Sequence, residues 1–242
     1  MTVTRTQLQL DPVRQRWRSI DAVIFLVYYG LFMAYNFVAR EAEPLHWVSL
    51  VLFPLTIVYV LTRRVYRGDL GDALASVGLR RGALRSGLLL AGAVGLGLSC
   101  VQLFVSDRRH EIWPIITSGR VLVYLPLVVV LLFVTAGFTE ELFFRGVLQT
   151  RLAAWWGHEV WAAIAAAVLF GLYHFPYIYF LSSSNLRGHA LGALGECGMD
   201  ALAGLAIGLV YWRSRKNLLA AVVTHVLIGA LPALTLIHFG PR

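Results

Sequence analysis

Long apolar runs alternate along the chain with short polar or basic segments. Runs of about 20 apolar residues are long enough to cross a bilayer as helices. The runs occupy residues 20–39, 46–62, 86–105, 121–154, 159–175, 194–212 and 218–239. This pattern predicts an all-α, polytopic transmembrane helix bundle with seven spans, or eight if residues 68–84 or 177–194 hold a further helix. The mildly amphipathic segment 70–84 is alternatively a helix that lies on the membrane surface.

Charged residues interrupt the fourth apolar run. Glu140, Glu141 and Arg145 lie within it. On a helix Glu141 and Arg145 share a face and can form an ion pair, whereas Glu140 is rotated by about 100° and points elsewhere. A charge at membrane depth costs at least about 2.5 kcal/mol, so its default interpretation is functional. The alternative is that the helix leaves the bilayer near Phe138 and that these charges meet lipid head groups.

Two further spans carry a histidine. His174 lies at the end of the fifth run, just before Pro176, and His225 lies within the seventh. Alone, each imidazole could be interfacial or bonded to a backbone carbonyl. Together with the glutamates, the two histidines predict one interior cavity. Burying ionisable side chains in lipid costs least free energy when they face one another inside the bundle. Counting 1.5 Å per residue places Glu140 and His174 about 25 Å from the turn near Gly157, but His225 only about 12 Å from its own turn.

The sixth run contains polar and small residues at helical spacing. Glu196 and Asp200 are four residues apart and either line the same cavity or its mouth, or belong to a solvated helix start. Gly204 and Gly208 form a small-xxx-small pair, which is typical of close helix packing.

Two hydrolytic chemistries fit a glutamate and two histidines. A carboxylate in a dry cavity can act as general base on a water molecule, with imidazoles that orient this water or donate to an oxyanion. Alternatively His174, His225 and a glutamate form the three protein ligands of a catalytic zinc. The chain lacks the helical His-Glu-x-x-His arrangement of soluble zinc peptidases. Both chemistries lead to hydrolysis of an amide bond within or near the membrane.

Composition supports a membrane protein. The chain has 242 residues, of which 58% are hydrophobic and 14% charged, with a formal net charge of +8. Soluble domains carry about a quarter charged residues. The positive charge lies in short segments between apolar runs, which indicates topology and not a nucleic-acid-binding face. These basic segments predict a cytoplasmic N-terminus (residues 1–19), loop 63–85, turn 213–216 and Arg151 region.

The ordered motifs resemble those of the CAAX protease and bacteriocin-processing (CPBP, or Abi) family of intramembrane proteases. The family pattern is Glu-Glu-x-x-x-Arg, Phe-x-x-x-His and a late His-x-x-x-Asn/Asp. This chain matches it between about residues 120 and 230 with Glu140, Glu141, Arg145, Phe170, His174 and His225. The resemblance implies a CAAX-protease-like bundle in which Glu140 activates water, Glu141 and Arg145 support the site, and the two histidines assist. It favours a metal-free glutamic peptidase over a zinc metalloprotease.

One position departs from the family pattern. Gly229 stands where the pattern has Asn or Asp. If that side chain holds the oxyanion, its loss costs about 3 kcal/mol of transition-state stabilisation. Thr224 or a water molecule are then the candidate substitutes.

We therefore expect a single transmembrane domain, residues 1–242, with a catalytic core at about 120–230. The expected activity is cleavage of a membrane-associated protein or peptide near its C-terminus or transmembrane segment. Eukaryotic relatives act on prenylated tails, but the Arg- and Ala-rich composition is typical of bacteria, where an inner-membrane location and peptide maturation or processing of C-terminal anchors are expected. Two alternatives are a non-catalytic immunity or scaffold protein, which Gly229 permits, and a proton-coupled transporter, although the chain shows no inverted repeat.

Overall fold

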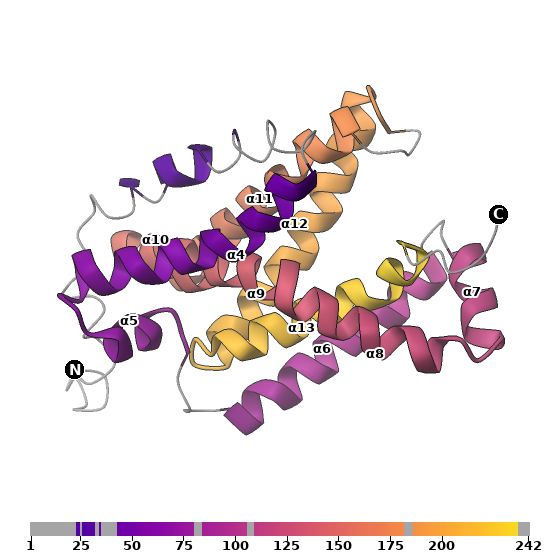
Figure 1. Cartoon of the computed structure of the whole chain (residues 1–242), viewed down its shortest axis with the longest axis horizontal. Helices are drawn as coiled ribbons and strands as arrows, with labels where there is room; N and C mark the ends of the chain where they lie inside the picture. Colours follow the sequence, from indigo (N-terminus) through magenta and orange to yellow (C-terminus); the bar gives the residue numbers. More distant parts are fainter. Residues whose placement is uncertain are drawn as a thin grey trace.

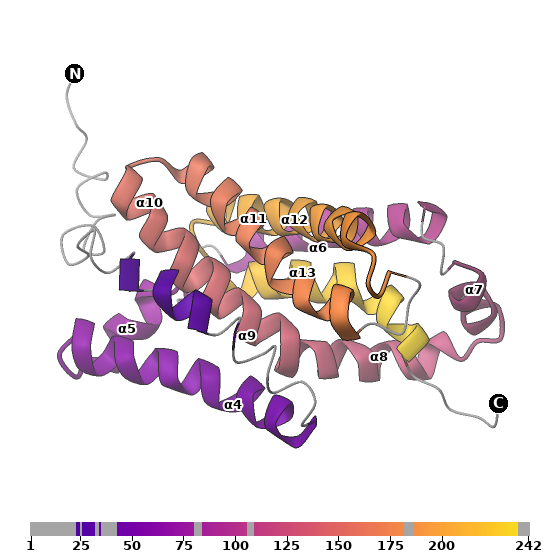
Figure 2. The same ribbon diagram turned by 90° about the horizontal axis from the view of Figure 1, so that it is seen from above.

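The computed structural model describes residues 23–24, 26–31, 34, 43–79, 84–105, 109–181 and 186–236. Every regular element in these ranges is helical. Most of the longer helices run along the long axis of the molecule (Figures 1 and 2). The predicted all-α class is confirmed for the described part of the chain.

The helices, in chain order, are α4 (Glu43–Val60), the π-helical η1 (Leu61–Val65), α5 (Leu70–Ser76), α6 (Leu84–Val105), α7 (Arg109–Thr117), α8 (Val121–Leu132), the π-helical η2 (Phe133–Gly137), α9 (Phe138–Glu141), the π-helical η3 (Leu142–Gln149), α10 (Thr150–Trp156), α11 (Glu159–Pro176), the π-helical η4 (Tyr177–Leu181), α12 (Ala190–Arg213), α13 (Leu218–Ala233) and the 3-10 turn η5 (Leu234–Leu236). The elements from α8 to α10 join into one continuous helix of 36 residues.

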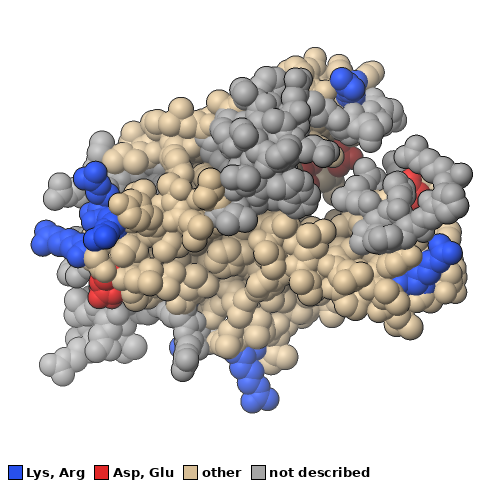
Figure 3. Space-filling view, in the orientation of Figure 1, with Lys and Arg blue, Asp and Glu red and all other residues tan. Residues whose placement is uncertain are grey.

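Four of these helices are long and apolar enough to cross a membrane, judged by length and composition. They are Leu84–Val105, Val121–Trp156, Glu159–Phe180 and Ala190–Arg213. They correspond to the third to sixth predicted spans. Most of the visible face carries neither Lys, Arg, Asp nor Glu, and its Lys and Arg side chains lie at the edges (Figure 3). These features indicate an integral membrane protein.

The other predicted spans have different outcomes. Segment 1–19 and most of the predicted first span lie outside the described residues. The second appears as helix α4, which begins three residues earlier than predicted and continues into η1. The seventh appears as α13, which is 16 residues long. A helix of that length covers about 24 Å, less than the hydrocarbon core of about 30 Å.

Two prolines do not end helices as predicted. Pro176 is followed by the π-helical segment η4, in which the chain remains helical to Leu181. A π turn can absorb the backbone hydrogen bond that a proline removes. Pro114 lies within the nine-residue helix α7, between the third and fourth predicted spans. The predicted surface segment 70–84 is helical only over α5, and residues 80–83 lie outside the described part.

Helix α13 is the central element of the bundle. It packs against α6, against the long helix from α8 to η3, and against α12, while α11 packs along α12 (Figures 1 and 2). Half of the residues of α13 are buried, including Thr224 and Val226. The third motif therefore sits on a helix that contacts the first motif directly.

Local sequence signals fix the end of the long helix and the start of α13. Gly157 ends α10 in the left-handed conformation, with φ of 70°. Asn217 caps α13, because its side-chain oxygen accepts hydrogen bonds from two backbone N–H groups of the first turn. Gly78, with φ of 89°, accepts a 3.0 Å hydrogen bond from the N–H of Leu218. A Cβ at this glycine would collide with the Lys216 carbonyl, so the position requires glycine.

The long helix extends further than its neighbour, which accounts for about half of the mismatch in predicted depth. The Thr150 hydroxyl lies 3.1 Å from the Tyr211 hydroxyl. Thr150 is seven residues from Gly157, whereas Tyr211 is two residues from the end of α12 at Arg213. The long helix thus projects about five residues, or ~7.5 Å, beyond α12. Counting from Gly157 therefore placed Glu140 too deep relative to His225.

Candidate active site

The helix that carries the carboxylates is irregular on both sides of them. The single α turn α9 lies between the π-helical segments η2 and η3. π-Helical segments are rare and are found frequently at functional sites. Two glycines allow close packing here: a Cβ at Gly137 would lie 2.8 Å from Val226, and one at Gly146 would lie 3.0 Å from Val77. The Val226 side chain thus approaches the helix closely just before α9, and Val77, including its backbone carbonyl, does so after α9.

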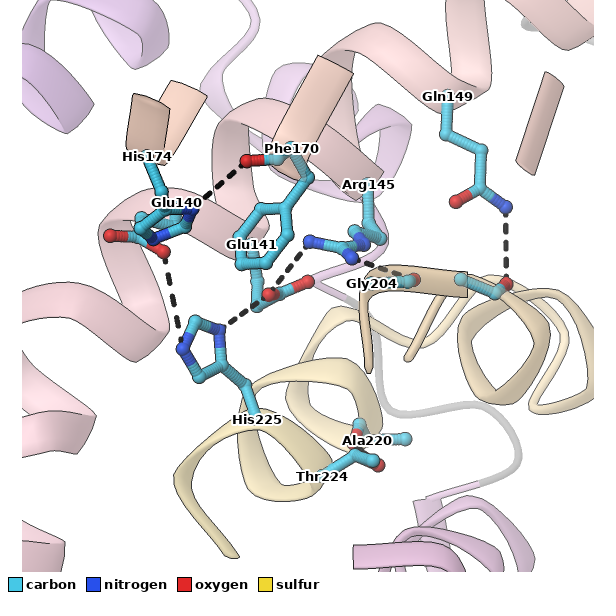
Figure 4. Close-up of polar contacts among 11 residues, drawn as sticks. Glu140, Glu141, Arg145, Gln149, Phe170, His174, Gly204, Ala220, Thr224 and His225 are labelled. Carbon is cyan, nitrogen blue, oxygen red and sulfur yellow. Dashed lines mark hydrogen bonds and ion pairs between the residues drawn. The ribbon is translucent and has the colours of Figure 1, made fainter. Parts of the chain in front are cut away.

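The predicted ion pair between Glu141 and Arg145 is confirmed. The Arg145 Nη1 group donates a 2.8 Å hydrogen bond to Glu141 Oε1, and both side chains are 0% exposed (Figure 4). Arg145 Nη2 also donates to the Gly204 carbonyl at 2.7 Å, and the guanidinium lies 4.6 Å from the centre of the Phe170 ring. The alternative in which these charges reach lipid head groups is wrong, because both are enclosed by protein.

His225 joins the same carboxylate. Its Nδ1 lies 2.7 Å from Glu141 Oε1, the oxygen that also accepts from Arg145. An ionised carboxylate only accepts, so Nδ1 carries the proton and donates it. The other ring nitrogen, Nε2, faces Glu140 Oε2 at 3.9 Å. The two adjacent glutamates therefore lie against opposite nitrogens of one imidazole, whereas sequence spacing alone had predicted that Glu140 points elsewhere.

Glu140 is buried without a close partner for one oxygen. The residue is 9% exposed, and its Oε2 makes no hydrogen bond with any described protein atom. The 3.9 Å distance to His225 Nε2 is too long for a direct hydrogen bond. Glu141 Oε2 also lacks a hydrogen bond with the described residues, but Glu141 Oε1 accepts from two donors. Glu140 is therefore the carboxylate of the pair that remains available to another molecule.

His174 adjoins this group across the Phe170 ring. The Phe170 ring centre lies 4.9 Å from that of His174 and 5.8 Å from that of His225, in edge-to-face geometry (Figure 4). His174 Nδ1 lies 2.9 Å from the Phe170 carbonyl, which can only accept. Nδ1 therefore carries the proton, and in the neutral ring Nε2 keeps its lone pair. The Phe170 side chain thus contacts a group from each motif.

Several contacts of the site were not predicted from sequence. Gln149 donates a 3.1 Å hydrogen bond to the Gly208 carbonyl, one turn beyond the bond from Arg145 to Gly204. Asp200 Oδ2 lies 3.7 Å from His174 Nδ1. Asp200 is in the middle of α12, which begins at Ala190, so it borders the site and is not at a helix start. The sequence signals for these contacts were two i, i+4 pairs on this helix. One is Gly204 and Gly208, and the other is Glu196 and Asp200, for which lining the cavity or its mouth was one of two alternatives.

Thr224 does not replace the missing Asn or Asp. Its hydroxyl is buried and donates a 2.8 Å hydrogen bond to the Ala220 carbonyl within its own helix (Figure 4). Position 229 itself has room, because a Cβ there would meet only Leu132 Cδ1, at an ordinary 3.5 Å. Packing therefore does not explain why glycine stands at this position.

The described side chains of the site do not form a set of metal ligands. No three His, Cys, Asp or Glu side chains of the described residues are arranged so that they could hold one. Both imidazoles donate through Nδ1, which leaves Nε2 able to act as a ligand. His225 Nε2, however, faces a single carboxylate oxygen at 3.9 Å. The arrangement of these side chains does not fit the predicted three-ligand zinc site.

Comparison with known proteins identifies one family. Residues 122–231 match a family model described as type II CAAX prenyl endopeptidase, Rce1-like. No curated protein and no solved structure matches the chain. The matched range includes Glu140, Glu141, Arg145, His174 and His225.

Replacing Gly204 with Ala should loosen the site. The added Cβ would lie 2.9 Å from the Phe170 ring and 3.1 Å from Arg145 Nη2, so both groups must shift. Overpacking of this kind costs about 1–3 kcal/mol. We expect Gly204→Ala to lower the melting temperature of the detergent-purified protein. Gly198→Ala is the matched control, because its Cβ would have no neighbour within 4 Å in the described structure. Equal melting temperatures for the two variants would contradict the packing described here.

Proposed function

We propose that the protein is an intramembrane endopeptidase, on the premise that residues 122–231 form a domain of the Rce1-like type II CAAX prenyl endopeptidase family. The observation that carries the proposal is the buried Glu140 carboxylate, which has an oxygen without a hydrogen bond to the described residues and lies beside His225. Its neighbour Glu141 is neutralised by Arg145. A carboxylate so placed can take a proton from water.

The proposed reaction is glutamate-assisted hydrolysis. Glu140 removes a proton from a water molecule as the water oxygen attacks the carbonyl carbon of the scissile peptide bond. The carbonyl oxygen becomes the oxyanion of a tetrahedral intermediate. Glu140 then delivers the proton to the peptide nitrogen, the carbon–nitrogen bond breaks, and an amine and a carboxyl group leave.

In their neutral form, the histidines are proposed to orient the attacking water and not to donate a hydrogen bond to the oxyanion. Both rings donate through Nδ1, so Nε2 of the neutral ring has only a lone pair to offer. A water molecule that donates one hydrogen to Glu140 and the other to an imidazole Nε2 directs its own lone pairs at the substrate. The oxyanion needs a donor from elsewhere, which is the role left open by Gly229.

We further propose a membrane arrangement for this chemistry. Besides the four apolar helices, α4, α13 and the predicted first span also cross the bilayer, which gives seven spans with a cytoplasmic N-terminus. The substrate is a membrane-associated protein or peptide that reaches Glu140 laterally from the lipid. The family description favours a prenylated C-terminal tail, and an unprenylated membrane peptide is the alternative that the composition favours.

Replacing Glu140 with Gln should abolish cleavage. Gln has the same shape but cannot act as a base, and general-base catalysis contributes about 10²- to 10⁴-fold. The assay uses purified protein in proteoliposomes with a quenched fluorescent peptide that ends in a farnesylated Cys-a-a-X sequence, and with the same peptide without the lipid. His174→Ala should also be strongly impaired.

The control for this assay is Glu196→Gln, which removes an exposed carboxylate from α12. Cleavage that persists undiminished in Glu140→Gln would refute the proposed mechanism. A different result would favour the non-catalytic immunity or scaffold function over the proposed protease. In that result the unmodified protein cleaves no probe, and cells that carry Glu140→Gln behave like cells that carry the unmodified protein. That alternative is favoured by one observation, the glycine at position 229.

Removal of metal ions should leave the activity intact. The ring nitrogens and carboxylates are arranged for hydrogen bonding, with no three-ligand set among the described residues. We therefore expect equal cleavage rates before and after incubation with 1,10-phenanthroline and dialysis, with metal content followed by mass spectrometry. Loss of activity that returns only when Zn²⁺ is added would overturn the metal-free mechanism.

Installing Asn at position 229 should raise the turnover rate. This position is one turn after His225 on the same helix face, and a Cβ fits there at 3.5 Å from Leu132. An oxyanion donor contributes up to about 3 kcal/mol, or roughly 100-fold in kcat. Gly229→Ala is the control, because it adds a side chain at this position without the amide group that donates hydrogen bonds. This variant should not raise kcat. A Gly229→Asn protein with unchanged kcat and an intact melting temperature would contradict the missing-donor explanation.

A further inference from the structure

His174 has a second neighbour that the proposed reaction does not use. Its Nδ1 lies 2.9 Å from the Phe170 carbonyl and 3.7 Å from Asp200 Oδ2. Asp200 belongs to α12, the helix that packs along α11, so the contact joins two helices. The side chains of His174 and Asp200 are 26% and 38% exposed, so each is largely covered by protein.

We propose that Asp200 is a positioning residue for His174. Its carboxylate, 3.7 Å from Nδ1, favours the tautomer in which Nδ1 carries the proton and donates to the Phe170 carbonyl. The Nε2 lone pair is then presented to the water that Glu140 activates. The inference rests on the proposed function, because it assigns the orientation of a group within that site. Asp200 itself touches neither the water nor the substrate in this assignment.

The physical basis of this role is which hydrogen-bond donors and acceptors the His174 ring, the Phe170 carbonyl and the Asp200 carboxylate offer. The Phe170 carbonyl and an ionised carboxylate are both acceptors only, and both lie on the Nδ1 side of the ring. Two acceptors on one side favour the tautomer with its proton on Nδ1. The partner of one ring nitrogen determines what the other nitrogen can do. The same logic explains why an aspartate orients the histidine of serine-protease triads.

The Phe170 carbonyl is insufficient for this role by itself. That carbonyl lies on the same helix as His174, four residues earlier, so it moves with the helix and cannot relate the ring to another element. Asp200 is the group from α12 that lies against the ring. It also lies one turn before Gly204, whose carbonyl holds Arg145. One helix thus orients both His174 and the ion pair beside Glu140.

Glu196 offers a matched control on the same helix. It lies one turn before Asp200 and is exposed. No contact between Glu196 and His174 is seen in the described structure. A general effect of acidic charge on α12, including attraction of a basic substrate, should change when either residue is neutralised. Orientation of His174, by contrast, should change when Asp200 is neutralised and not when Glu196 is.

The test compares Asp200→Asn, Asp200→Glu and Glu196→Gln in the proteoliposome cleavage assay with the same fluorescent peptides. An amide is a weaker acceptor and can also present an N–H group to Nδ1, so it weakens the tautomer preference. We expect Asp200→Asn to lower kcat by about 10- to 100-fold, the range known for residues that orient a functional histidine at a metal site, with little change in KM. Asp200→Glu should restore much of kcat, and Glu196→Gln should leave both constants unchanged.

A second measurement does not depend on activity. The ring nitrogen shifts of ¹⁵N-histidine-labelled protein in detergent micelles report the tautomer, and His174→Ala identifies the signal. We expect the Nδ1–H form of His174 in the unmodified protein and a larger share of the Nε2–H form in Asp200→Asn.

The outcomes separate the two proposals. An Asp200→Asn protein with normal kcat and an unchanged tautomer overturns the positioning role, even if Glu140→Gln is inactive. A change confined to KM, shared by Glu196→Gln, also overturns it in favour of substrate attraction. Persistent activity in Glu140→Gln overturns the proposed function, whereas a tautomer shift in Asp200→Asn would still establish the contact with His174.

Discussion

A single carboxylate oxygen, Glu141 Oε1, connects three helices of this bundle. It accepts hydrogen bonds from Arg145 on its own helix and from His225 on α13, and the guanidinium of Arg145 continues to the Gly204 carbonyl on α12. All charge in this chain of contacts is enclosed by protein. Removing one member of a buried ion pair is strongly destabilising, by about 3–5 kcal/mol, because the other charge is left without compensation. The position of α12 and α13 relative to the long helix therefore depends on this pair.

The pair also divides the work between two adjacent glutamates. Glu141 satisfies the cation and fixes the His225 ring through Nδ1, while Glu140 faces the opposite nitrogen with an oxygen that is left without a hydrogen bond among the described residues. Identical side chains one residue apart thus meet different surroundings, as expected when burial and partners decide the chemistry of a carboxylate. The segments η2 and η3 flank this turn, and their wider π geometry accompanies the change of environment.

Spacing and hydropathy were sufficient to predict the parts of the structure that depend on local sequence. They identified the long apolar helices and the pairing of Glu141 with Arg145, because i, i+4 geometry is a property of one helix. They did not predict the features that depend on contacts between helices or on the local helix geometry around a proline. The chain remains helical past Pro176, in the π-helical segment η4. Which His225 nitrogen each glutamate approaches depends on how two helices far apart in the sequence pack together. The contact between Asp200 and His174 depends on how α11 and α12 align, which no spacing within either helix specifies.

The glycines of α12 show that packing and polar contacts cannot be separated at this interface. Gly204 and Gly208 have the spacing of a helix-packing pair, and close approach is indeed what they permit. Without side chains, however, they also leave two backbone carbonyls open to Arg145 and Gln149 from the long helix. A Cβ at either position would fall within 3 Å of the Phe170 ring or the Gln149 amide. The absence of a side chain on α12 therefore gives Nη2 of the buried Arg145 a backbone acceptor, while Nη1 makes the ion pair with Glu141 that leaves Glu140 available for chemistry.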